Sequence, residues 1–109
     1  MDNTWYEIKN MDAVDSPSVV LYLDHLKFNV KEMIGLVNGD LSRLMPHIKT
    51  NKMPKVMEHL LASGITNFKA STVAEAEIAA EAGAKSVLIA HQLVGPKIDR
   101  FLNLTSHFP

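Results

Sequence analysis

Short apolar runs alternate with helix-favouring segments along most of this chain of 109 residues, and this alternation constrains the fold more than any other feature. Residues 65–70 and 86–90 are apolar on both faces, as strands covered by helices must be. Strands that alternate with helices and short turns are typical of right-handed βαβ units around a parallel sheet. The sequence therefore predicts an α/β fold.

The first part of the chain divides at a turn. We expect residues 1–17 to form a lead-in and residues 18–109 to form the βα units. The turn Asp15-Ser16-Pro17 precedes residues 18–23, which are rich in β-branched and aromatic residues and are predicted to form a buried strand. Asp24 is then the predicted N-cap of a helix that ends at Asn38-Gly39.

The later units show the same start and stop signals. Pro54 is placed to begin a helix, and Gly64 to end it. Thr72 and Glu75 have the spacing of a capping box, and the alternative for Glu75 is a proton-transfer group at the mouth of a barrel. Gly95-Pro96 opens a last amphipathic segment. Together these signals predict helices of about ten to fifteen residues between the strands.

Two architectures are compatible with this pattern. A small doubly wound α/β sheet is complete with a few strands, whereas a (β/α)₈ TIM-type barrel needs about 200 residues or more. A barrel would therefore be represented here only by its first units. The alternation of strands and helices does not decide between these two architectures.

The composition excludes several classes of function. Lys and Arg number 11 against 12 Asp and Glu, so the net charge of -1 favours neither nucleic acid nor an anionic membrane as a partner. Cysteine is absent, and the five histidines lack the spacing of a metal motif, so no metal ligands are assigned in this chain. The polar N-terminus and the lack of a long apolar run predict a cytoplasmic protein without a membrane segment.

The stretch Pro46-His47-Ile48-Lys49-Thr50-Asn51-Lys52 is the strongest candidate for a site. It follows a short apolar step and precedes a helix, and catalytic side chains of α/β proteins gather where strands end. Lys49 could act as a Schiff-base amine there, and the alternative is a solvated basic turn. His47 could orient a cofactor ring, or could be a turn histidine bonded to a nearby carbonyl. His91 and Gln92 end another predicted strand and would face the same rim.

Four stretches of the chain resemble one enzyme family. The segment from Asp15 to Asn29 resembles the opening of fold-type-III pyridoxal-phosphate enzymes of the alanine racemase N-terminal class. Residues 46–52 are similar to the lysine motif of the D-threonine aldolase and D-serine dehydratase branch, and residues 70–77 and 89–96 resemble its next strand-to-helix junctions. Met45 and Asn51 depart from the branch, which commonly has Arg and His there.

The resemblance implies a site and a cofactor. Lys49 is identified as the catalytic lysine that binds pyridoxal 5'-phosphate, with His47 and Thr50 as cofactor-binding neighbours. Thr72, His91 and Gln92 are the candidates for the rim of this site, because they follow predicted strands. The cofactor accepts the electron pair of a carbanion at the Cα of an amino acid. The implied fold is the N-terminal part of an alanine racemase-type (β/α)₈ barrel. The remaining units and a C-terminal β domain are then expected outside this chain.

The implied function is that of a D-threonine aldolase-like lyase, which cleaves D-3-hydroxy amino acids to glycine and an aldehyde. Dehydration of D-serine and amino-acid racemisation are alternatives within the same fold. A further alternative is a chain that is inactive on its own. The resemblance also implies a homodimer and a divalent metal in the full-length protein, with metal ligands that this chain does not contain.

Overall fold

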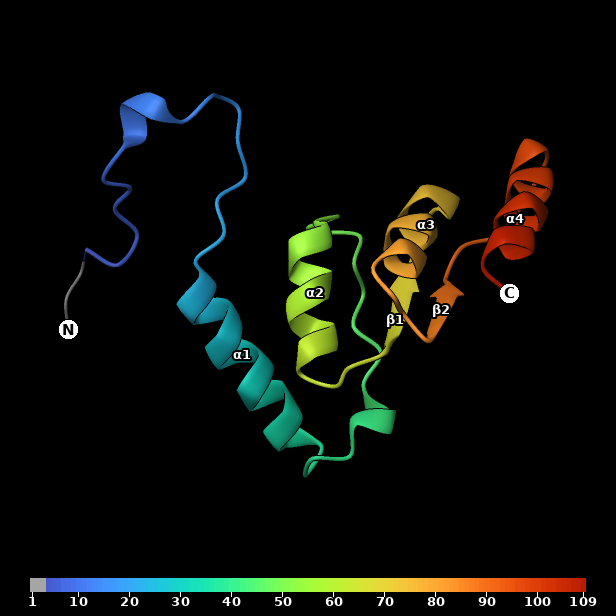
Figure 1. Cartoon of the computed structure of the whole chain (residues 1–109), viewed down its shortest axis with the longest axis horizontal. Helices are drawn as coiled ribbons and strands as arrows, with labels where there is room; N and C mark the ends of the chain where they lie inside the picture. The colour runs from blue at the N-terminus through green and yellow to red at the C-terminus, as the bar shows by residue number, and fades with distance from the viewer. Residues whose placement is uncertain (1–3) are drawn as a thin grey trace.

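The computed structural model describes residues 4–109, so the first three residues of the predicted lead-in lie outside the described part. These residues form four α-helices and two β-strands, connected by turns and two short 3-10 helices, Met11–Ala13 and Leu41–Arg43. The elements are α1 (Leu23–Leu36), α2 (Pro54–Ala62), β1 (Asn67–Ala70), α3 (Val73–Glu81), β2 (Ser86–Ile89) and α4 (Pro96–His107) (Figure 1).

The two strands are parallel and are joined through α3. Their register runs from Asn67 opposite Ser86 to Ala70 opposite Ile89. A third segment lies along β1, where His47 forms an isolated parallel bridge with Lys69. The structure thus confirms the prediction of a mixed α/β fold with parallel strands. These segments do not close a barrel, so the barrel itself stays a prediction.

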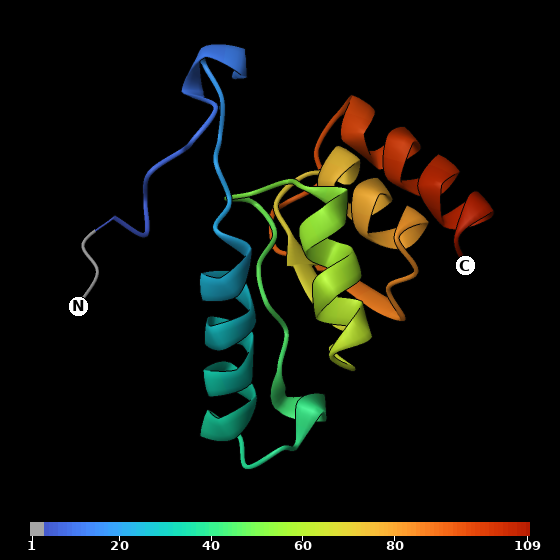
Figure 2. The same ribbon diagram turned by 60° about the vertical axis from the view of Figure 1, so that its left-hand side comes forward.

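The hydrophobic core lies between the sheet and the helices that cover one of its faces. Phe68 and Ala70 of β1 are fully buried, and they alternate with the half-buried Asn67 and Lys69. α3 contacts both strands and α2, and Figure 2 shows α2 and α3 side by side. α1 adds Val30 to the same cluster. The cluster contains these buried side chains: Val30, Leu44, Ile48, Val56, Met57, Leu60, Ile65, Phe68, Ala70, Ala76 and Ala79.

Several predicted helix boundaries are confirmed. α2 begins with Pro54, which has no backbone N–H to leave unbonded in the first turn. Gly64 follows this helix with φ +88°, a conformation that glycine adopts without steric cost. The hydroxyl of Thr72 caps α3, and Gly95 precedes the first residue of α4. Local signals were therefore sufficient at these positions.

Residues 18–23 do not form the predicted strand. Residues 18–22 belong to no regular element, Val19 is 77% exposed, and Leu23 already belongs to α1, whose N-cap is Tyr22 instead of Asp24. A strand requires a hydrogen-bonded neighbour, and no segment of residues 4–109 pairs with this one. The apolar composition of residues 18–23 is therefore not sufficient to form a strand without a partner segment.

The second correction concerns β2, which was predicted to be buried. Its residues alternate between exposed and half-buried, and Leu88 is 50% exposed. α3 packs against this strand, and the face that carries Ser86 and Leu88 is largely open to solvent. No helix within residues 4–109 is long and apolar enough to cross a membrane.

Candidate active site

The predicted site residues lie together at one edge of the sheet. The segment around His47, β1 and β2 run parallel, so the residues that follow them emerge at the same, C-terminal edge. Ala90 N–H donates to Ala70 O at 2.8 Å and extends the pairing up to this edge. The residues that follow the three segments are Lys49 and Thr50, then Ser71 and Thr72, then His91 and Gln92.

Lys49 lies in the turn that follows the bridge and is exposed. Its ammonium group forms no ion pair or hydrogen bond with any residue that the structure describes. The neighbouring lysines differ, because Lys52 Nζ lies 3.4 Å from Glu75 Oε1 and Lys55 Nζ lies 2.9 Å from Glu58 Oε2. Lys49 is thus the lysine of this motif whose amine is free to react with a ligand.

His47 contacts the backbone of the predicted lysine. The Lys49 N–H donates to His47 Nδ1 at 3.3 Å, so this ring nitrogen carries a lone pair and the proton of the neutral ring lies on Nε2. Hydrogen bonding to a carbonyl, one of the two roles considered for this histidine, is not what the structure shows. The ring instead helps to shape the turn and keeps its Nε2–H as a donor.

The rim residues are exposed at the same edge, but their side chains form no hydrogen bond with Lys49. His91 Nδ1–H donates to Gln92 O at 3.1 Å, which leaves His91 Nε2 as an acceptor. The Thr72 hydroxyl accepts the Glu75 N–H at 3.1 Å and is therefore engaged in capping α3. The Thr50 hydroxyl has no hydrogen-bond partner among the described residues.

Glu75 is the residue whose surroundings the sequence did not reveal. It is 2% exposed, and its carboxylate accepts the Ser71 N–H at 2.6 Å and the Ser71 hydroxyl, with Lys52 as its ion-pair partner. Burial would raise the pKa of this carboxyl, but the bonds from Ser71 and the charge of Lys52 outweigh burial, so the pKa lies below its ordinary value. The capping-box spacing predicted the Thr72 bond but not these contacts.

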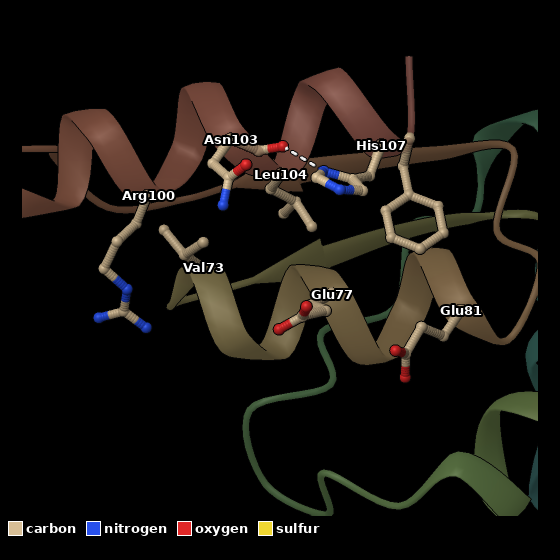
Figure 3. A pocket seen from close by; sticks show the side chains of 8 residues that line it. Val73, Glu77, Glu81, Arg100, Asn103, Leu104 and His107 are labelled. Atoms are coloured by element: carbon tan, nitrogen blue, oxygen red, sulfur yellow. Dashed lines mark hydrogen bonds between the residues drawn. The ribbon is translucent and has the colours of Figure 1, made fainter.

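A groove of about 540 Å³ lies between α3 and α4, away from the predicted site residues. Glu77 and Glu81 of α3 face Arg100, Asn103 and His107 of α4 across it (Figure 3). The groove contains none of the residues that follow the strands. Within residues 4–109 no cluster of three or more histidine or acidic side chains could hold a metal ion.

The parallel α/β unit carries an unpaired lysine at the edge where its strands end, which is the edge at which α/β enzymes gather their catalytic side chains. Comparison with known proteins identifies relatives of this chain. D-threo-3-hydroxyaspartate dehydratase from Delftia sp. (strain HT23) is 31% identical over 92 residues, and D-threonine aldolase from Arthrobacter sp. is 32% identical over 83 residues. These matches cover 84% and 76% of this chain.

The crystal structure of D-threonine aldolase from Filomicrobium marinum matches 84% of this chain with a TM-score of 0.71 and 33% identity. No family model matches the chain. The resemblance predicted from the sequence is confirmed: homologues of this chain are D-threonine aldolases and a D-threo-3-hydroxyaspartate dehydratase. The chain spans about a quarter of the length of each of these relatives, which are lyases.

Proposed function

We propose that this chain supplies the cofactor-binding lysine of a pyridoxal-phosphate-dependent lyase that acts on D-3-hydroxy amino acids. The substrate class follows from the names of the two curated relatives. D-Threonine and D-threo-3-hydroxyaspartate both carry an amino group at Cα and a hydroxyl at Cβ. A shared machinery that activates Cα and then breaks a bond at Cβ accounts for both names.

The free amine of Lys49 is the observation that carries this proposal. A primary amine condenses with the aldehyde of pyridoxal phosphate, and an amine already paired with a carboxylate is a poorer nucleophile. Lys49 has no such pair, whereas Lys52 and Lys55 each have one. When bound, the cofactor supplies an electron sink for the pair released at Cα.

Other residues of this edge suit the same ligand. His47 holds the Lys49 backbone through Nδ1 and can donate from Nε2 to a cofactor oxygen. The Thr50 hydroxyl, next to Lys49, can donate to the same ligand. His91 Nε2 can accept a proton from a substrate hydroxyl, since its Nδ1–H is held by Gln92 O.

For the reaction itself we propose retro-aldol cleavage to glycine and an aldehyde, as in the two relatives named aldolases. Loss of the β-hydroxyl is the second candidate, because the other curated relative is named a dehydratase. The groups that separate these reactions act on the hydroxyl at Cβ. Assays of D-threonine and D-threo-3-hydroxyaspartate distinguish them, since cleavage yields glycine and dehydration yields ammonia and a 2-oxo acid.

We further propose that residues 18–109 are the first βα units of an alanine racemase-type (β/α)₈ barrel in a cytoplasmic homodimer. The match to one quarter of a solved D-threonine aldolase supports the barrel. The half-buried and exposed side chains of β2 support it as well, because further strands would cover them. The D-amino acid would then enter at the edge where Lys49 lies.

Reduction of the protein with borohydride after addition of pyridoxal phosphate tests the proposal. We expect one pyridoxyl group per chain, mapped by peptide mass spectrometry to Lys49 and lost in Lys49→Ala. Lys55→Ala is the matched control, because Lys55 is exposed and paired with Glu58 outside the strand edge. Equal labelling of Lys49→Ala and the unmodified sequence, or labelling centred on Lys52 or Lys69, would contradict the proposal.

A further inference from the structure

The buried carboxylate of Glu75 has no part in the function proposed above. Its side chain is 3% exposed, and a charge at such a site is stable only when hydrogen bonds and an opposite charge replace water. Ser71 donates both its N–H, at 2.6 Å, and its hydroxyl, at 2.8 Å, to Oε2. Lys52 Nζ lies 3.4 Å from Oε1. Both oxygens of the carboxylate are therefore engaged.

The two partners of Glu75 belong to different parts of the chain. Ser71 directly follows β1, whereas Lys52 ends the turn that carries Lys49. Glu75 itself lies in the first turn of α3. Its carboxylate consequently ties the lysine turn to the junction between β1 and α3, next to the residues of the sheet edge.

The turn that carries Lys49 is bonded at several points. The Lys52 N–H donates to Ile48 O at 3.0 Å, and the Met53 N–H donates to the Asn51 side chain at 3.2 Å. Lys52 has φ +50°, a left-handed conformation that lysine adopts only at a cost. The conformation that directs Lys52 toward Glu75 therefore has to be stabilised by its surroundings.

We propose that Glu75 is a positioning residue that, through Lys52 and Ser71, fixes the turn of residues 49–52 and with it the Lys49 amine at the sheet edge. The contacts of Glu75 alone support the claim that it fixes the turn. The claim that a fixed turn helps to bind a cofactor rests on the proposed function. The ion pair joins the lysine turn to a carboxylate that Ser71 holds at the end of β1.

Four variants test this role. Glu75→Gln keeps the shape and one acceptor oxygen but removes the charge, and Lys52→Met removes the charged partner, whose side chain is 58% exposed. Lys52→Arg keeps the charge and the reach. Glu77→Gln is the matched control, because it removes an exposed carboxylate two residues along the same helix.

The measurement is amide hydrogen exchange at Lys49, Lys52 and Met53. Loss of overall stability would speed exchange throughout the protein, whereas loss of positioning would speed it selectively at these three amides. Glu75→Gln and Lys52→Met should each speed exchange at these amides about tenfold, as expected from loss of a charge-assisted bond, relative to amides of β1 and α3. Lys52→Arg should restore the slow exchange, and Glu77→Gln should leave it unchanged. The two disruptive changes together should have no more effect than one.

Uniform acceleration across the protein, or none at the three turn amides, would overturn the positioning role. The rate at which pyridoxal phosphate forms a borohydride-reducible adduct provides the second measurement. Slower adduct formation in Glu75→Gln and Lys52→Met supports the benefit for the cofactor. If the unmodified sequence forms no adduct at Lys49, the proposed function fails, while the exchange rates still decide whether Glu75 fixes the turn.

Discussion

The backbone of His47 lies against Lys69 as a parallel bridge partner. Lys69 N–H donates to Pro46 O, and Ile48 N–H donates to Lys69 O, both at 2.9 Å. These two bonds align the segment with β1, so the chain leaves the sheet at the same edge as Ser71. The location of Lys49 at the strand ends is thus set by backbone pairing one residue before the turn.

The imidazole of His47 should control how firmly the turn holds Lys49. Replacing it in His47→Leu removes the acceptor of the Lys49 N–H, so exchange of this amide should become about fivefold to tenfold faster, as loss of one ordinary hydrogen bond predicts. His47→Asn should retain slow exchange, because an asparagine oxygen accepts from the N–H two residues on. Equal exchange in both variants and the unmodified sequence would show that the ring is irrelevant to the turn.

Truncation of Phe68 should be the most damaging single change in the sheet. This side chain is fully buried at the centre of the cluster, so Phe68→Ala should lower the free energy of unfolding by about 3–5 kcal/mol. Leu88→Ala, on the open face of β2, should cost about 1 kcal/mol or less. Urea unfolding followed by circular dichroism measures both. Similar costs would mean that the two faces of the sheet are equally covered.

Local sequence signals predicted the features that depend on a few neighbouring residues. Pro54 and Gly64 mark the ends of α2 because proline and glycine restrict or free their own backbone. The apolar step followed by a turn likewise predicts Lys49 at a strand end, and the bridge between His47 and Lys69 locates the turn there. The role of Lys49 as the cofactor lysine stays a prediction.

Features that depend on distant contacts were not predictable in this way. Residues 18–23 have the composition of a strand, but pairing requires a neighbour that composition does not specify. Glu75 has the spacing of a capping box, yet its carboxylate contacts Ser71 and Lys52, because the fold brings the lysine turn beside α3. Both outcomes depend on which segments meet in space.

The turn after α2 offers a test of backbone and steric strain together. An added Cβ at Gly64, with φ +88°, would lie 2.7 Å from Leu41 Cδ1, whereas one at Gly83, with φ +100°, would meet no atom within 4 Å. Both alanine variants should lose about 1–2 kcal/mol of unfolding free energy for the left-handed backbone. Gly64→Ala should lose more. Leu41→Ala has a cost of its own because Leu41 packs against the core, but in a double-mutant cycle it should reduce the cost of Gly64→Ala by that excess. An equal loss for the two glycines would indicate that Leu41 moves aside freely.

The buried carboxylate of Glu75 should make stability depend on acidity. Because the hydrogen bonds and the Lys52 charge lower its pKa in the folded protein, the unfolded chain binds the proton more readily. The contribution of Glu75 is therefore fully present above the ordinary pKa of about 4.5 and is lost as the pH falls through the lower pKa of the folded state. The free energy of unfolding should decline with acidity in this window.

Comparison with Glu75→Gln isolates this contribution from the other carboxylates. The variant cannot titrate at this position, so the difference in unfolding free energy between the two proteins should be largest near about pH 6 and should shrink toward about pH 3. Glu77→Gln is again the matched control, because that side chain is exposed and has no ion-pair partner in the described structure. Denaturant unfolding at several pH values provides the measurement. A constant difference would mean that folding leaves the pKa of Glu75 unchanged, and a difference that grows at low pH would mean that the folded protein holds Glu75 protonated, contrary to the ion pair with Lys52.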